Sequence, residues 1–352
     1  MNSYDFALVG QGLAGSLLAM ELIRQGKSVI VVEQPAPITA SRVAAGMFNP
    51  VVFKRLNLSW NAKEFLPLAL DYYHQLEQEL GVKCCFAMPL ARFFNDAFGA
   101  NQFAVEADGS LLDHLSVQSY SELDNFDAPF GYGIVTSAGY VDLNILIDAV
   151  RDWLISRESW MELKVDPNSI QFSKSGVQFE KVTAGAMICA NGTGILDWPQ
   201  WSHLPITRTK GQVLTIENAT DATGFILNNG KFLLPVGGKT YRAGSTYEWT
   251  LDHNDPDETG KHEILDKLKP FLKSDHCVTH HVAGNRPTCK DRRPVLGWHP
   301  SIPRLAVFNG LGTRGVILAP AMTLMMANLL LSNIEPIEEA SVRRFDKYFK
   351  NN

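Results

Sequence analysis

The sequence predicts an α/β fold with α+β insertions, in which a Rossmann-like nucleotide-binding domain is interleaved with a smaller antiparallel β-sheet domain. Glycine turns between an apolar strand and an apolar helix occur near both ends of the chain, and short β segments separated by Asn-Gly and Gly-Gly turns lie between them. We expect residues 1–80, 140–207 and 285–352 to form the first domain, and residues 81–139 and 208–284 to form the second.

The amino-terminal unit has the pattern of a dinucleotide-binding motif. An apolar strand leads into Gly10-x-Gly12-x-x-Gly15, an apolar helix follows, and a second strand ends at Glu33, about 20 residues downstream. Gly10 permits the tight turn, Gly12 lets the backbone approach a pyrophosphate, and Gly15 lets the helix pack closely on the strand. The helix amino terminus favours phosphate, and Glu33 is placed to accept hydrogen bonds from ribose hydroxyls.

Composition indicates an enzyme-sized globular chain. At 352 residues and 45% hydrophobic content the chain can bury more than one core, given about 100–200 residues per domain. The net charge of −5 argues against nucleic acid as the default partner, although a local basic groove remains open. Of the five cysteines, Cys84 and Cys85 are adjacent and the rest are scattered. They show neither a disulfide framework nor zinc spacing, so we expect a reducing, cytoplasmic location and no metal site.

The longest apolar run, residues 316–331, is shorter than the roughly 20 residues of a membrane span and contains Pro320, so we expect a buried helix and no membrane span. Further helices are predicted from about 61 to 80 and after Asp142, which is a suitable capping residue. A buried strand is expected at 186–190. Residues 82–139 read as irregular and strand-like.

Several stretches together resemble the successive signatures of the D-amino-acid oxidase (DAO) family of FAD-dependent oxidoreductases. The resemblance covers nearly the whole chain, and its two carboxy-terminal motifs are most similar to the glycine oxidase branch and to the oxidase domain of a tRNA wobble-uridine modification enzyme. The stretches are Gly10-Gln11-Gly12-Leu13-Ala14-Gly15, Ala44-Ala45-Gly46-Met47, Ser137-Ala138-Gly139-Tyr140-Val141-Asp142, Ala190-Asn191-Gly192, Lys210-Gly211-Gln212-Val213, Gly284-Asn285-Arg286-Pro287 with Asp291 and Pro294-Val295-Leu296-Gly297, and Asn309-Gly310 with Gly312 and Arg314-Gly315-Val316.

The resemblance implies FAD as a non-covalent cofactor. No histidine follows Glu33 in the Ser41-Arg42 loop, and Cys289 is offset from the cysteine that flavin-linked sarcosine oxidases use. Independently, the helix that begins at Gly315 could direct its amino end at an electron-rich flavin ring. The predicted cofactor-binding residues are Gly10, Gly12, Leu13, Ala14, Gly15, Glu33, Gln34, Arg42, Ala44, Ala45, Gly46, Met47, Val165, Ala190, Asn191, Gly192, Gly312, Thr313, Arg314, Gly315 and Val316.

The resemblance also implies the substrate residues. It places Arg286 over the flavin, where the guanidinium would hold a substrate carboxylate by a bidentate pair. The glycine oxidase pattern has a tyrosine in the strand that ends before Pro235, and this chain has Phe232 there, which puts a simple glycine preference in doubt. Tyr247 could supply a hydroxyl instead. We expect the adjacent His280 and His281 to be solvated or hydrogen-bonded, because no carboxylate or cysteine stands at ligand spacing.

Three functions follow from these residues. The first is oxidation of the C–N bond of a small amine or amino acid of the glycine, sarcosine or D-amino-acid type, by hydride transfer to flavin N5 and hydrolysis of the imine, with O2 or another compound as electron acceptor. The second is the same chemistry on the carboxymethylaminomethyl group of tRNA, with a basic funnel formed by Lys54, Arg55, Lys290, Arg292 and Arg293. The third is a non-catalytic flavin-binding protein.

Overall fold

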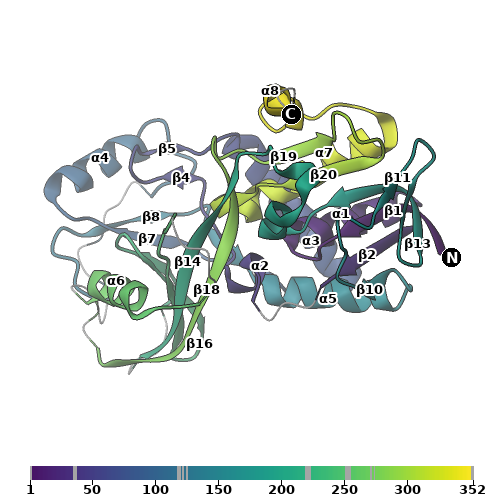
Figure 1. Cartoon of the computed structure of the whole chain (residues 1–352). Helices are drawn as coiled ribbons and strands as arrows, with labels where there is room; N and C mark the ends of the chain where they lie inside the picture. Colours follow the sequence, from purple (N-terminus) through teal and green to yellow (C-terminus); the bar gives the residue numbers. More distant parts are fainter. Residues whose placement is uncertain are drawn as a thin grey trace.

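The computed structural model describes residues 2–34, 38–116, 120, 123, 126–218, 223–249, 255–269, 272 and 274–349. Two β-sheets of different character lie side by side (Figure 1). Helices α1 (Leu13–Arg24), α5 (Leu143–Ile155) and α7 (Gly315–Ser332) pack on the first sheet, and helix α6 (Glu258–Leu268) packs on the second. The predicted mixed α/β class is confirmed.

The first sheet has the strand order β10-β2-β1-β13-β12-β11, and β20 and β19 extend it from β13. Strands β10, β2, β1, β13 and β20 run parallel. Strands β2 and β20 are apolar and buried on both faces, as is typical of parallel strands. The strands are β1 (Asn2–Val9), β2 (Val29–Glu33), β10 (Trp160–Glu162), β11 (Gln171–Phe172), β12 (Val177–Phe179), β13 (Val182–Cys189), β19 (Val295–Trp298) and β20 (Leu305–Asn309).

The strand register brings three turns to the same edge of this sheet. Val9 pairs with Cys189, and Cys189 pairs with Val307, so the carboxyl ends of β1, β13 and β20 lie next to one another. The turns that follow these strands begin at Gly10, Ala190 and Gly310. Ligands of open α/β sheets bind at such an edge.

The helices on the first sheet, α1, α5 and α7, are joined by α3 (Ala62–Leu80), which packs against α7 and α5. The predicted helix near 61–80 is confirmed, as is the cap at Asp142, whose carboxylate accepts hydrogen bonds from the amides of Asn144 and Ile145. The Tyr73 hydroxyl of α3 donates to the Val316 carbonyl of α7 at 2.9 Å, which fixes these helices against each other.

Helix α7 is longer than the apolar run suggested. The stretch Gly312–Ser332, of 21 residues with a mean hydropathy of 1.8, is long and apolar enough to cross a membrane by length and composition alone. However, 61% of its most apolar window is buried, and the helix packs against α1 and α3. Because a core helix passes the same test, this helix is weak evidence for a membrane span.

The second sheet has the order β18-β14-β17-β16-β15-β7-β8 and is antiparallel except between β15 and β7. Helix α6 (Glu258–Leu268) covers one face, where Ile264 and Leu268 pack with Leu214 and Tyr241. The strands are β7 (Leu90–Phe93), β8 (Tyr132–Val135), β14 (Ile206–Asn218), β15 (Ile226–Asn228), β16 (Phe232–Gly237), β17 (Thr240–Gly244) and β18 (His276–Cys289).

The long β14–β18 pair joins the two sheets. Its register runs from Ile206 opposite Cys289 to Asn218 opposite His276, and the Ile206 and Cys289 side chains are packed in a core of the first sheet. The prediction of short β segments between residues 208 and 249 was therefore wrong for β14, which is 13 residues long.

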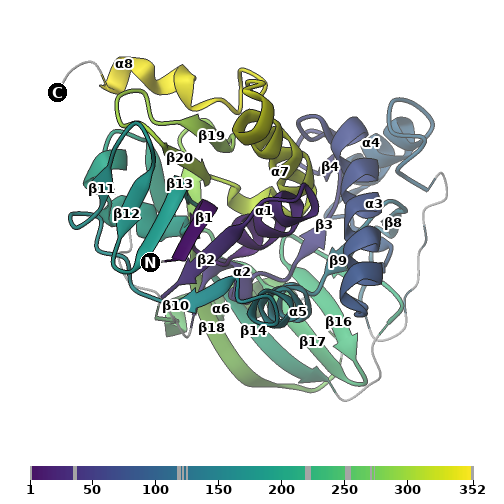
Figure 2. The same cartoon turned by 90° about the vertical axis from the view of Figure 1, so that its right-hand side faces the viewer.

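Between the sheets lie smaller elements that contribute to both cores (Figure 2). Phe48 packs in the core with α3, whereas its neighbour Met47 packs in the core under the second sheet. These elements are α2 (Ala40–Val43), the small sheet β3 (Met47–Phe48), β9 (Gly139–Val141) and β6 (Cys85–Ala87), and the hairpin β4 (Val51–Val52) and β5 (Asn57–Leu58). The short helices η1 (Gly192–Asp197), η2 (Pro199–Trp201), η4 (Val342–Phe345) and α8 (Asp346–Phe349) pack instead in a core of the first sheet, and η3 (Gly312–Arg314) leads into α7.

One helix was missed by the sequence analysis. Helix α4 (Ala97–Ala107) lies within the stretch that was predicted to be irregular and strand-like. The Asp96 carboxylate caps it by accepting a hydrogen bond from the Gly99 amide, while Phe98 and Val105 are exposed. The apolar side chains therefore surround the helix and obscure the period of 3.6 residues by which an amphipathic helix is recognised.

Candidate active site

A cavity of about 660 Å³ lies at the carboxyl edge of the first sheet and extends to the second sheet. Most of the predicted site residues line it. They are Gly10, Gly12, Leu13, Ala14, Glu33, Gln34, Ala44, Ala45, Gly46, Met47, Val165, Ala190, Asn191, Gly192, Phe232, Arg286, Gly312, Thr313, Gly315 and Val316. Four predicted residues, Gly15, Arg42, Tyr247 and Arg314, lie outside this lining.

The first glycine turn is built for close backbone approach. Gly10 has φ of +103°, and a Cβ there would lie 2.7 Å from the Ala190 carbonyl oxygen. A Cβ at Gly15 would lie 1.9 Å from the Gly10 carbonyl oxygen, so Gly15 contributes close helix packing and not a cavity wall. Gly12 provides no side-chain cap for α1, and Ser41 Oγ accepts a hydrogen bond from the Leu13 amide at 3.1 Å. The helix amino terminus therefore faces the cavity with its positive dipole end.

Glu33 lies at the end of β2 and lines the cavity. Its carboxylate accepts a hydrogen bond from the Gln11 amide, and the pKa of Glu33 is raised because burial disfavours the charged form. Arg42 lies nearby but pairs with Asp148 at 2.5 Å on α5, which explains why its side chain is absent from the cavity wall. The second carboxylate oxygen of Glu33 can therefore accept a hydrogen bond from a molecule bound in the cavity.

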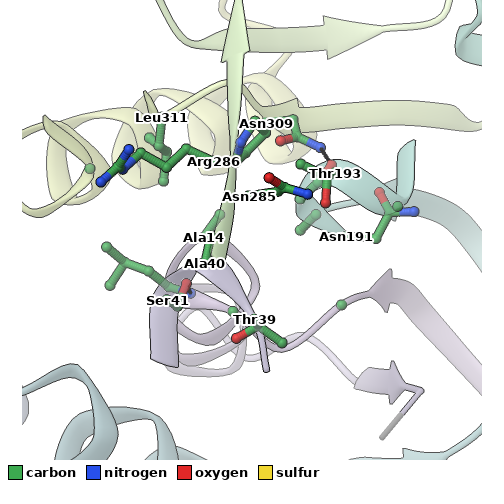
Figure 3. Close-up of a pocket in the computed structure, with 18 of the residues that line it drawn as sticks. Ala14, Thr39, Ala40, Ser41, Asn191, Thr193, Asn285, Arg286, Asn309 and Leu311 are labelled. Carbon is green, nitrogen blue, oxygen red and sulfur yellow. Dashed lines mark hydrogen bonds between the residues drawn. The ribbon is translucent and has the colours of Figure 1, made fainter. Parts of the chain in front are cut away.

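The turns after β13 and β20 are joined by a side chain. Asn309 Nδ2 donates to the Gly192 carbonyl at 2.9 Å, and Asn309 Oδ1 accepts from the Gly310 amide (Figure 3). Asn285 and Thr193 also line the cavity beside them. Asn285 Oδ1 and Asn191 Oδ1 are buried without a hydrogen-bond partner in the part of the chain that the structure describes. Sequence reasoning missed Asn285 and Asn309 as site residues, although both lie within its motifs.

Arg286 lies in β18 and extends across β14 into the cavity. A Cβ at Gly211 would lie 2.0 Å from Arg286 Nη2, so the guanidinium occupies the space that the missing side chain leaves. Nη2 donates to Ser245 Oγ at 3.0 Å, and Nη1 is buried without a partner among the described residues. Burial lowers the pKa of Arg286, but an arginine stays charged at physiological pH. Arg286 is thus a partly buried cation that lines the cavity and has one donor without a partner in the described chain.

Phe232 and Tyr247 take different positions around Arg286. The Phe232 ring lies over Gly244, where a Cβ would be 3.2 Å from its Cζ, and it lines the cavity. Tyr247 is 39% exposed, and its ring centre lies 6.0 Å from Arg286 Cζ. The strand β16 contains Pro235 and does not end before it, which corrects the sequence-based boundary. Tyr247 thus belongs to the surface beside Arg286.

Arg314 is half-buried in η3, and its Nη1 is enclosed without a partner in the described chain. Burial, followed by the charge of Arg293, lowers the pKa of Arg314. Arg293 itself stacks on the Trp60 ring at 4.4 Å. The other residues of the predicted basic funnel, Lys54, Arg55, Lys290 and Arg292, are exposed.

The adjacent residues His280 and His281 differ in their surroundings. His281 Nε2 lies 2.8 Å from Gln212 Oε1, as expected for a hydrogen-bonded residue, and His280 is exposed. Within the described residues no three His, Cys, Asp or Glu side chains are close enough to hold a metal ion.

The three glycine turns at one sheet edge, the acidic end of β2 and the cavity closed by a second sheet define a dinucleotide-binding oxidoreductase. The FAD dependent oxidoreductase family (DAO) matches residues 5–329, and the chain belongs to this family. The residues fit FAD: the Gly10 turn and the amino end of α1 suit the phosphates, Glu33 suits the ribose, and the buried Asn191 oxygen has unused acceptor capacity.

Among curated relatives, the tRNA 5-methylaminomethyl-2-thiouridine biosynthesis bifunctional protein MnmC of Legionella pneumophila (strain Corby) is 24% identical over 93% of this chain and 54% of that protein. The chain thus spans about half the length of that relative. Glycine oxidase of Bacillus licheniformis is 28% identical, with 97% of this chain and 96% of that protein covered. The crystal structure of glycine oxidase from Geobacillus kaustophilus has the same fold, with a TM-score of 0.79, 18% identity and coverage of 96% and 97%.

Proposed function

We propose that this FAD-dependent oxidoreductase oxidises the C–N bond of a small amine that carries a carboxylate, such as an amino acid. The observation that carries the proposal is Arg286, a buried guanidinium that faces the cavity and is held by one neutral hydroxyl. A buried charge requires a partner, and a planar guanidinium suits a carboxylate because the two can form parallel hydrogen bonds. The substrate carboxylate would complete this pair.

The surroundings of Arg286 would orient the amine. Val213 and Phe232 line the cavity beside it and give that part of the wall an apolar surface. An apolar wall disfavours the ammonium form and so lowers the pKa of the substrate amine, which must be neutral to release a hydride from the adjacent carbon. FAD, when bound, would supply the two-electron acceptor for this oxidation. Water then hydrolyses the imine to an oxo product and an amine or ammonia.

The cofactor is proposed to be dissociable. The cavity wall contains no cysteine or histidine among the described residues, and the Cys289 thiol is buried near Arg344 and Asp291. Burial raises the pKa of Cys289 to about 12, so its thiolate is scarce at neutral pH. Electron transfer from the reduced cofactor to O2 is the proposed route of reoxidation.

The proposal is tested by anaerobic absorbance spectra of the holoprotein with glycine, sarcosine, proline and D-amino acids. We expect one of these to bleach the oxidised flavin band. Arg286→Ala should retain FAD yet lose about 2–5 kcal/mol of carboxylate binding, because a buried charge pair is removed. Arg343→Ala, which changes an exposed arginine paired with Glu335, is the matched control. Unchanged bleaching kinetics in Arg286→Ala would overturn the assignment.

A second candidate, oxidation of a modified tRNA uridine, is favoured by one specific feature. Tyr247 and Trp249 are 39% and 45% exposed, their ring centroids are 5.2 Å apart, and Tyr247 adjoins Arg286. Exposed aromatic rings beside a cation can stack on nucleobases. This candidate predicts that tRNA bleaches the flavin when the amino acids do not, and that binding weakens steeply as salt rises. Salt-independent activity on a free amino acid would contradict it.

A further inference from the structure

A second partly buried arginine lies on the cavity-facing side of the second sheet. In β7, Ala91 and Phe93 pack in the core under α6, whereas Leu90 packs in the core on the opposite face. Because side chains alternate along a strand, Arg92 shares the face of Leu90. Phe232, which lines the cavity, packs on that same face. Arg92 is not itself part of the cavity wall, but it lies on the same side of the sheet as Phe232.

The strand register places Arg92 in one row with the cavity wall. Arg92 pairs with Asn228, Asn228 with Phe232, and Phe232 with Gly244, which precedes Ser245. Arg92 Nη1 donates to Asn228 Oδ1 at 2.7 Å, so the side chain leans one strand closer to Phe232. With strands about 4.8 Å apart, the guanidinium lies roughly 10 Å from the Gly244–Ser245 segment that holds Arg286.

Arg92 carries an uncompensated charge. Its contacts are the Asn228 amide and the Phe53 ring, 5.1 Å from Cζ, and no carboxylate pairs with it among the described residues. Arg92 is partly buried, and this burial lowers its pKa. On the same face, Arg242 is satisfied by the Val43 and Ala44 carbonyls. Arg92 thus resembles Arg286, because both are desolvated and held by a single neutral side-chain acceptor.

We propose that Arg92 binds a second anionic group, a carboxylate or a phosphate, at the far end of an extended amine substrate. This inference rests on the proposed function, in which Arg286 holds the first carboxylate. Phe232 lies between the two arginines and would contact the apolar part of the substrate. Phe53, in the turn of the hairpin β4–β5, stacks on Arg92 and leaves the guanidinium edge to form paired hydrogen bonds with an anion.

The test measures binding to the oxidised holoprotein without turnover. Changes in flavin absorbance are recorded with straight-chain dicarboxylates from succinate to dodecanedioate and with the monocarboxylates of the same lengths. We expect one intermediate length of dicarboxylate to bind at least about tenfold more tightly than its monocarboxylate, because a second charge-assisted pair forms. A carboxylate that ends in a phosphonate identifies the distal group: tighter binding than the dicarboxylate indicates phosphate, and weaker binding indicates carboxylate.

Arg92→Gln should abolish the preference for the dicarboxylate and leave monocarboxylate affinity unchanged. Arg157→Gln is the matched control, because Arg157 also stacks on an aromatic ring, Trp153, but is exposed and follows α5 on the first sheet. Equal affinities for the two ligand series in the wild type would overturn the proposal even if Arg92→Gln failed to fold. If Arg286→Ala bound monocarboxylates with the same affinity as the wild type, the proposed function would instead be overturned.

Discussion

Replacing Gly211 with alanine should displace Arg286 without disturbing the fold. The new Cβ would lie 2.0 Å from Nη2 and 2.3 Å from Cζ of Arg286, whereas ordinary van der Waals contact begins at 3.4 Å. The guanidinium must therefore move by about 1.4 Å, the difference between 3.4 and 2.0 Å. Because the obstructing atoms are the end of a flexible side chain, the backbone of β14 can stay in place.

The displacement has a calculable effect on binding. The bond from Arg286 to Ser245 Oγ is 3.0 Å long, so a shift of this size can break it and misdirect the fork that receives the carboxylate. If the displaced guanidinium loses one of its hydrogen bonds to the ligand carboxylate, the loss costs about 1.5–3 kcal/mol. The carboxylate ligand should then bind about 10- to 150-fold more weakly. Tm should change little, because the loss of the intramolecular bond to Ser245 opposes the gain from alanine, which loses less conformational entropy in a strand than glycine does.

The assay is a flavin difference-spectrum titration with a carboxylate ligand, accompanied by measurements of FAD content and Tm. Gly224→Ala is the matched control, because a Cβ at Gly224 would meet nothing within 4 Å and its φ is not positive. Wild-type affinity in Gly211→Ala, with FAD retained, would refute the reasoning that this glycine makes room for the substrate-binding guanidinium.

Three further outcomes are expected. Gly15→Ala places a Cβ 1.9 Å from the Gly10 carbonyl oxygen, so FAD content of the purified protein should fall sharply; full occupancy would contradict the packing role. Glu33→Gln should weaken FAD reconstitution by about tenfold, because it replaces the anionic acceptor; equal affinities of the two apoproteins would exclude that role. The hydrogen bond from Lys210 lowers the pKa of Asp257 to about 2, so its contribution to stability is complete above about pH 4 and lost toward pH 2. Urea midpoints measured across this range should depend less on pH in Asp257→Asn, and an identical profile would argue against the ion pair.

The sequence by itself determined the nucleotide-binding half of the protein. The turn from Gly10 to Gly15, the helix after it and Glu33 are local features, because each depends on residues a few positions apart and on the period of the apolar side chains. The cap at Asp142 and the helix near 61–80 were predictable for the same reason. Helix α4 was missed because its exposed Phe98 and Val105 blur that period.

Only the tertiary structure decided the substrate side of the cavity. Arg286, Gly211 and Ser245 come from different parts of the chain and meet because the register of β18, β14 and β17 brings them together. The row from Arg92 to Phe232 depends on register in the same way. Since a slip of one residue moves every side chain of a strand to the opposite face, such a constellation is fixed by strand pairing across the sheet and not by the local pattern of residues.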